Sequence, residues 1–191
     1  MTRTLIVSSS FNPASRSNQL ASMLTERLQG SGHEATHRAL KEISLPDVNH
    51  PSLFESESFR DCAQQVRDAN ALILASPVYN WSLSAELKKF IEVIGSTDSA
   101  HPSPFFDKLV SFVFAAGLPH SYMVLQTAAI PLMLDFRCII NPHQAYLHNR
   151  HWDENETLTP EGSAKLDQML KAHLELTTRL QGYQLTNSWQ V

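Results

Sequence analysis

The sequence alternates short apolar runs with longer segments whose apolar residues recur at helical spacing. Four apolar runs cover residues 4–7, 70–76, 108–116 and 137–141, and none shows the strict alternation of a half-exposed strand. Uninterrupted runs of this length are typical of strands that are buried on both faces of a sheet. A more polar run over residues 33–40 predicts a further strand at the edge of that sheet.

Helices are predicted in the segments between and after these runs. They cover residues 17–29, 56–69, 85–95, 121–135 and 160–181, most of them with apolar residues on one face. Pro160 suits the first turn of the last helix, whereas Pro131 predicts a kink or a late start in the fourth. Gly30 and Gly32 are expected to end the first helix.

This order of elements predicts an α/β fold with a parallel sheet between two layers of helices. Right-handed crossovers leave few topologies, and we expect a three-layer sandwich with five strands in the order 2-1-3-4-5. Ligands bind to such sheets beyond the carboxyl ends of the strands, where the strand order reverses. Function is therefore expected in the loops that follow residues 4–7, 70–76 and 108–116, within a single domain over residues 1–191.

The overall charge and the two cysteines narrow the class of protein. A net charge of −4 argues against a protein that binds nucleic acid through a broad basic face. Cys62 and Cys138 form no disulfide framework, which fits a reducing compartment. The apolar run near the N-terminus is too short for a signal peptide, and no stretch approaches the ~20 apolar residues of a membrane span. We expect a cytoplasmic protein without a membrane partner.

The first of the three loops is rich in hydroxyl groups. Residues 8–21 read SSSFNPASRSNQLA and contain five serines between a strand and a helix, with Arg16 as the only nearby cation. Unpaired N–H groups at a helix N-terminus attract anions, and serine hydroxyls add donors for phosphate oxygens. A phosphate site without a glycine-rich motif is therefore one interpretation. The other is a serine-rich turn with an ordinary helix cap.

The other two loops offer flat and small side chains. We expect Pro77 to end its strand, after which Tyr79 and Trp81 provide flat apolar surface in the segment PVYNWS. These rings could instead pack against a helix or a partner subunit. The small residues of FAAG, residues 114–117, permit close approach of a ligand to the backbone, or they simply end a strand.

Together these segments resemble the NADPH-dependent FMN reductase family. SSFNPASRSNQLA resembles its phosphate loop, which is close to G-S-x-R-x-x-S-x-N-x-x-L-A, and FAAG stands at its third flavin loop. SPVYNWSLSAELKKFIE resembles its segment P-x-Y-N-x-S-x-x-x-x-L-K-N-x-I-D, which is the more specific match. The resemblance extends to about residue 147. It implies a flavodoxin-like fold, bound FMN, and a homodimer or homotetramer.

The resemblance also implies which residues bind FMN. Phosphate contacts are expected from Ser10, Ser15 and Ser17, with Asn12 in the place of a common arginine. The flavin ring is expected to lie against the second segment, with Trp81 in the place of a residue that is commonly small. That segment comprises Pro77, Val78, Tyr79, Asn80, Trp81 and Ser82, and Ala115, Ala116 and Gly117 would face the pyrimidine or ribityl part.

The function implied is that of an FMN-dependent NAD(P)H oxidoreductase. NADPH or NADH would give a hydride to FMN, which would reduce a flavin, quinone or similar small acceptor. We assign no catalytic acid or base and no metal ligand. One alternative is a flavodoxin-type electron carrier without direct NAD(P)H turnover, although such carriers are usually more acidic. Another is a structural or regulatory protein that has lost FMN.

Four further features receive ordinary structural interpretations. His148 and His151 are read as parts of a polar loop, because their spacing alone is weak evidence for a metal site. Cys138 is expected to be a small buried apolar residue, and Cys62 lacks a cation that would activate its thiol. Trp81, Phe105 and Phe106 are candidate aromatic residues for a subunit interface.

Overall fold

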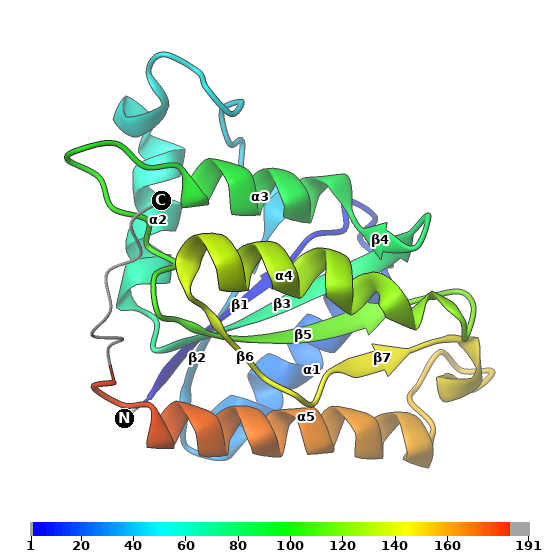
Figure 1. Ribbon diagram of the computed structural model, residues 1–191. Coiled ribbons are helices and arrows are strands. Elements are labelled where there is room, and N and C mark those ends of the chain that lie inside the picture. The colour runs from blue at the N-terminus through cyan, green and yellow to red at the C-terminus, as the bar shows by residue number, and fades with distance from the viewer. Residues whose placement is uncertain (1, 184–191) are drawn as a thin grey trace.

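The computed structural model describes residues 2–183 and shows a three-layer α/β sandwich (Figure 1). Five parallel strands form the path β2-β1-β3-β5-β6, which is the expected order 2-1-3-4-5 under labels that count every strand. Their bounds are Arg3–Ser8 for β1, Glu34–Ala39 for β2, Ala71–Tyr79 for β3, Leu109–Ala115 for β5 and Ile139–Ile140 for β6. The expected fold class is confirmed, and the polar run over residues 33–40 does form an edge strand.

The expected number of five strands is wrong, because the sheet has seven. β4 (Ser82–Leu83) turns back and pairs antiparallel with the end of β3. β7 (Ala145–Leu147) pairs with the carboxyl end of β5, beyond the point where the two-residue strand β6 stops. The apolar run at 137–141 thus forms only a short strand, and β7 continues the same edge of the sheet.

Helices cover both faces of the sheet. α1 (Arg16–Gly30) and α5 (Pro160–Arg179) lie on one face, and α2 (Glu57–Asp68), α3 (Ala85–Gly95) and α4 (Val124–Phe136) lie on the other. All five predicted helices are present. A short 3₁₀ turn precedes α4, which starts three residues later than predicted and keeps Pro131 inside it.

Hydroxyl side chains cap four of these helices. Ser15 caps α1, Ser56 caps α2, Ser84 caps α3 and Thr159 caps α5, each accepting a hydrogen bond from a backbone N–H of the first turn. A cap of this kind stabilises a helix by about 1 kcal/mol. Pro160 follows Thr159 at the start of α5, as the sequence predicts.

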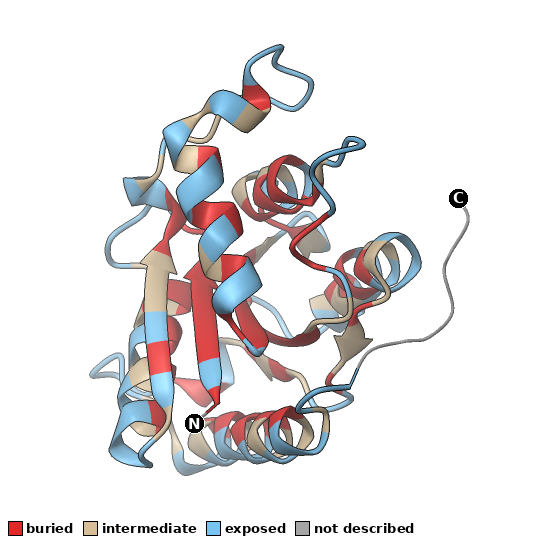
Figure 2. Cartoon of the chain, turned by 90° about the vertical axis from the view of Figure 1, so that its left-hand side faces the viewer, coloured by how far each residue is buried: buried red, intermediate tan, exposed pale blue. Residues whose placement is uncertain are grey.

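Two apolar cores flank the sheet (Figure 2). Alternate residues of each central strand point into opposite cores, as Leu72 and Ile73 of β3 do. Nearly all of β1, β3 and β5 is therefore buried, as expected for strands covered on both faces. Phe105 is fully buried in one core, so the expectation of an interface role for this residue is wrong.

A buried polar cluster ties α5 to the sheet. Nε2 of His173 lies 3.0 Å from Oγ1 of Thr4 in β1, and its Nδ1 lies 2.9 Å from Oγ of Ser111 in β5. Asn141 donates to Ser111 and to the carbonyl of Met169 in α5. The cluster lies within the interior beneath α5, where paired polar groups fix the position of the helix.

Pro77 does not end β3, contrary to expectation. β3 continues to Tyr79, and Pro77 pairs in register with Ala115 of β5. The carbonyl of Ala75 points toward β1, where it accepts from Ser9 N–H. Backbone groups two residues apart in a strand point to the same side, so the backbone nitrogen of Pro77 also points toward β1. Because β1 ends at Ser8, the missing N–H of Pro77 breaks no ladder bond.

Candidate functional site

Three loops meet at one edge of the sheet. β1, β3 and β5 are parallel neighbours, so the segments that follow them emerge side by side at their carboxyl ends. These are the loop before α1, the turn between β3 and β4, and the segment after β5. The sequence predicted this edge as the site, and the structure brings the three segments to it.

The loop before α1 folds into a turn that exposes donor groups. Oδ1 of Asn12 accepts from Ala14 N–H, and the carbonyl of Asn12 accepts from Ser15 N–H. Ser15 caps α1, and its Oγ lies 2.8 Å from Oγ of Ser17. Ser10 is buried and its Oγ accepts from Asn12 N–H at 3.3 Å, which leaves its own hydroxyl hydrogen free to donate.

Asn18 holds this turn in place. Its Nδ2 donates to the carbonyls of Ser10 and Asn12, at 3.2 and 3.0 Å. The side chain is buried, yet its Oδ1 has no hydrogen-bond partner among the described residues. An unsatisfied buried acceptor costs free energy, so a donor from a ligand would stabilise this arrangement.

The side chain of Arg16 points away from the turn and toward residues 149–156. Its guanidinium pairs with both carboxylate oxygens of Glu156, each at 3.1 Å, and donates to Asn149. It also lies over the ring of Trp152, 5.0 Å from the centroid. The hydrogen bond from Arg16 lowers the pKa of Glu156. The guanidinium of Arg16 is thus paired with a carboxylate and is not directed at the turn.

The two serines nearest β1 serve the scaffold instead. Oγ of Ser8 lies 2.8 Å from Nε2 of His37 in β2. Ser9 donates to the carbonyl of Ala75 and accepts from Oγ of Ser84, the cap of α3. Of the five serines, Ser10, Ser15 and Ser17 thus remain in the turn.

The turn between β3 and β4 is a two-residue hairpin. Tyr79 pairs with Ser82, and between them Asn80 and Trp81 have φ angles of 47° and 66°. Two left-handed residues make a type I′ turn, in which asparagine is favoured. A tryptophan in this conformation costs about 1 kcal/mol, which a glycine would not.

Side chains of the second segment divide between core and surface. Pro77 is buried, and Val78 packs against the core below the sheet edge. Tyr79 and Trp81 are more than half exposed, at 56% and 55%, and Asn80 is exposed between them. Flat apolar surface is thus available at the tip of this segment, as predicted.

The segment after β5 is held by the neighbouring strand. Ala116 N–H donates to the carbonyl of Leu147 at 2.7 Å, and Tyr146 Oη donates to the carbonyl of Leu118. Ala115 and Ala116 are largely covered, whereas Gly117 is exposed and a Cβ placed on it would meet no atom within 4 Å. Beyond it, the ring of His120 stacks on Trp81 with centroids 6.2 Å apart.

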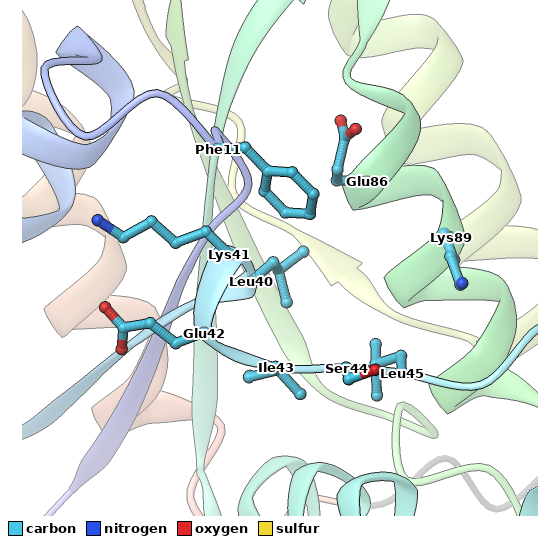
Figure 3. Close-up of a pocket in the computed structure, with 9 residues that line it drawn as sticks. All are labelled: Phe11, Leu40, Lys41, Glu42, Ile43, Ser44, Leu45, Glu86 and Lys89. Carbon is cyan, nitrogen blue, oxygen red and sulfur yellow. The ribbon is translucent and has the colours of Figure 1, made fainter.

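A pocket of about 450 Å³ opens beside the first loop (Figure 3). Phe11 projects toward it from that loop, and residues 40–45 and Glu86 and Lys89 of α3 form its other walls. Lys89 pairs with Asp47 at 2.7 Å, and that contact lowers the pKa of the Asp47 carboxyl. None of the residues predicted to bind a cofactor lines this pocket.

The histidines at 148 and 151 have structural partners. Backbone N–H of His148 donates to Nδ1 of His151, whose Nε2 lies 3.4 Å from Glu161 in α5. Within residues 2–183, no group of three or more potential ligands is placed to hold a metal ion. Nor does any helix in this range have the length and apolar character needed to cross a membrane.

The site fits a phosphorylated aromatic cofactor such as FMN. The turn offers hydroxyls at the positive end of α1, whose first turn contains no acidic residue, and this suits a phosphate. The unpaired Oδ1 of Asn18 at the same turn needs a donor, which a phosphate dianion lacks and a hydroxyl group of the same ligand supplies. The exposed rings of Tyr79 and Trp81 supply walls for a planar group, and Gly117 leaves room for one.

The fold and the site define a doubly wound α/β protein with a hydroxyl-rich turn between its first strand and its first helix. A family model described as NADPH-dependent FMN reductase matches residues 2–152. The chain therefore belongs to the NADPH-dependent FMN reductase family, and the resemblance seen in the sequence is confirmed.

Individual relatives agree with this assignment. The chain is 30% identical to the FMN reductase (NADPH) of Escherichia coli (strain K12) over 80 residues. These aligned residues make up 42% of this chain and 41% of that protein. The match thus spans less than half the length of that relative.

Two solved structures share the fold. The flavoenzyme NAD(P)H:(acceptor) oxidoreductase FerB from Paracoccus denitrificans has a TM-score of 0.75 at 16% identity, covering 94% of this chain and 98% of that chain. The NADH:FMN oxidoreductase EMOB in its apo form has a TM-score of 0.73 at 14% identity, covering 92% and 90%.

Sequence reasoning missed four residues of this edge. Asn18 and His120 were not singled out, and neither were Ser9 and Ser84 as a pair that joins two of the loops. Ser17 takes the place of the asparagine in the family's phosphate-loop pattern, and Asn18 is the residue after it, so the pattern itself does not mark Asn18. The contacts of Ser84 and His120 join distant segments, so no local pattern reveals them.

Proposed function

We propose that this protein is an FMN-dependent NAD(P)H oxidoreductase, which passes a hydride from NADPH or NADH through FMN to a flavin, quinone or similar small acceptor. The observation that carries the proposal is the hydroxyl-rich turn at the N-terminus of α1, beside two exposed aromatic rings. Membership of the family supports both the cofactor and the electron donor.

Each part of the site has a separate role in this proposal. Ser10, Ser15 and Ser17, with the N-terminus of α1, would bind the phosphate. The side chain of Asn12 accepts a hydrogen bond within the turn, and Arg16 is paired with Glu156. Most of the hydrogen bonds to the phosphate would therefore come from hydroxyl groups and backbone N–H groups. The N–H groups of Ser10 and Phe11, which have no hydrogen-bond partner within residues 2–183, are among those donors.

The other two loops would bind the ring. Tyr79, Asn80 and Trp81 would form one wall, with Pro77, Val78 and Ser82 as its support. Backbone groups around Ala115, Ala116 and Gly117 would approach the opposite edge. When bound, FMN supplies hydride transfer between donor and acceptor, which requires no acid or base from the protein.

Direct turnover separates this proposal from a flavodoxin-type carrier. Purified protein saturated with FMN is mixed with NADPH, then NADH, and with menadione as acceptor, and the loss of the reduced nucleotide is followed. Sustained oxidation that depends on FMN is the expected result. Reduction of FMN without turnover would support a carrier, and no interaction with FMN would support a protein that has lost it.

A second copy of the chain is the proposed partner. Ile130, Met133 and Leu134 share one face of α4 and are all about half exposed, at 51%, 48% and 57%. An apolar helix face of this kind favours burial against another subunit, which supports the expected homodimer or homotetramer. Light scattering of the wild type and of Leu134→Asp tests it. A monomeric wild type would contradict it.

The setting of the enzyme is proposed as well. Cys62 and Cys138 are both buried and unpaired, which supports a reducing compartment such as the cytoplasm. The net charge of −4 supports a small-molecule partner rather than a nucleic acid.

A further inference from the structure

Two aromatic side chains from different loops are stacked on each other at the candidate site. Trp81 lies at the tip of the hairpin between β3 and β4, and His120 lies in the segment after β5. Their ring centroids are 6.2 Å apart, and the ring planes differ by 27°. The stack therefore links the two loops that would flank the flavin ring.

This pair contributes little to the fold. Both side chains are exposed, and neither forms a hydrogen bond with another described residue. Trp81 also holds a left-handed backbone conformation with φ of 66°, which is unfavourable for a large side chain. Unfavourable conformations kept at an exposed position are typical of functional sites.

We propose that Trp81 is the stacking wall for the electron acceptor and that His120 occupies part of this wall until an acceptor arrives. The proposal rests on the proposed function and names its substrate class: a planar aromatic molecule, such as a quinone or a free flavin, rather than a metal complex. Trp81 acts here as a specificity-determining residue.

The acceptor ring can replace His120 on Trp81 because of the sizes of the rings and their exposure. Imidazole is small, and its stack on an exposed indole is replaceable by a larger planar ring, which covers more apolar surface. Neither ring is covered by the core, so the exchange leaves the packing of the sandwich intact. An octahedral metal complex has no flat face to offer the indole.

Steady-state kinetics with two acceptors test the assignment. Trp81→Asn removes the ring and keeps a residue that tolerates the left-handed conformation. With FMN at a concentration that saturates the variant, we expect its KM for menadione to rise about five- to tenfold more than its KM for ferricyanide, which reports the effect of the substitution on the flavin itself. Trp81→Phe should show a smaller rise. His120→Ala should lower the KM for menadione, because the ring that competes for Trp81 is gone.

Two further measurements complete the design. Tyr122→Asn is the matched control, because this ring is 57% exposed near His120 and outside the stack; its KM values should stay at the wild-type level. Menadione added to the oxidised, FMN-loaded protein should quench tryptophan fluorescence more in the wild type than in Trp81→Phe.

Failure of this inference is distinguishable from failure of the proposed function. If NADPH reduces the bound flavin but Trp81→Asn changes the KM of both acceptors equally, or of neither, the stacking wall is refuted and the oxidoreductase remains. If NADPH does not reduce the flavin in the wild type, the proposed function itself is wrong. A rise in the menadione KM for His120→Ala would refute this role of His120.

Discussion

The hydroxyl groups of Ser9 and Ser84 lie 2.8 Å apart in the protein interior, although 75 positions separate them in the chain. Ser84 caps α3 by accepting from Leu87 N–H, while Ser9 donates to the carbonyl of Ala75 in β3. Ser84 N–H in turn donates to Oγ of Ser76. This chain of hydrogen bonds connects the start of α3 to the turn before α1.

Ser84→Ala is therefore expected to weaken both the fold and the site. Loss of the cap should lower the free energy of unfolding by about 1–2 kcal/mol in urea titrations. The turn before α1 also loses the hydrogen bond from Ser84 to Ser9, so the Kd for FMN should rise. Ser56→Ala removes the cap of α2, away from the three loops, and is the control. It should lower stability by a similar amount and leave the Kd for FMN unchanged; equal effects on FMN binding in both variants would contradict the account.

Asn18→Ala should damage FMN binding more than stability. Without its amide, the carbonyls of Ser10 and Asn12 lose the donor that shapes the turn. We expect the Kd for FMN, measured by quenching of flavin fluorescence, to rise about tenfold or more, which corresponds to about 1.4 kcal/mol or more. Asn70→Ala is the matched control, because Asn70 accepts from Arg3 N–H at the opposite edge of the sheet. An Asn18→Ala variant with wild-type FMN affinity would argue against a phosphate site at this turn.

Stability should fall with acidification because of His173. Burial, with a smaller effect of His33, lowers the pKa of His173 from 6.5 to about 4. The unfolded chain therefore binds the proton more readily than the native protein, and stability that is present above pH 6.5 is lost as the pH falls toward 4. Between about pH 7.5 and about pH 5 this amounts to about 2 kcal/mol.

A comparison of variants isolates that contribution. The urea-derived free energy of unfolding should fall by about 2 kcal/mol more in the wild type than in His173→Gln over this pH range. His143→Gln, at an exposed position, should keep the wild-type pH dependence. Parallel pH profiles for the wild type and His173→Gln would show that this histidine is not buried in its neutral form.

Both cysteines should resist alkylation in the native protein. Burial raises the pKa of Cys62 to about 11 and that of Cys138 to about 12, so thiolate is scarce near neutral pH. Iodoacetamide at about pH 8 should leave both thiols unmodified over a time that fully labels the urea-unfolded chain, as mass spectrometry would show. Rapid labelling of Cys62 in the native state would contradict its buried position.

The fold was largely predictable because its signals are local. Uninterrupted apolar runs marked β1, β3 and β5, and helical spacing or composition located all five helices. β4 and β7 were missed, because each has two or three residues and owes its pairing to a neighbour rather than to its own sequence. Pro77 was misjudged because its tolerance depends on where β1 ends, which is a property of two strands together.

The site was predictable in outline and not in its connections. The position after β1 and the serines pointed to the hydroxyl-rich turn, and the family motif pointed to the hairpin that exposes Tyr79 and Trp81. The pairing of Arg16 with Glu156, 140 positions away, could not be read from the chain. The stack of Trp81 on His120 and the contact of Ser9 with Ser84 likewise arise only when the loops meet in space.

The most direct test of the account is an absorbance spectrum of the purified protein, taken after addition of FMN and removal of the unbound excess, and again after addition of NADPH under nitrogen. The account predicts a flavin band that stays with the protein and bleaches when NADPH is added. A protein that retains no flavin band would contradict it, and the turn before α1 would then be a capped helix start and no phosphate site.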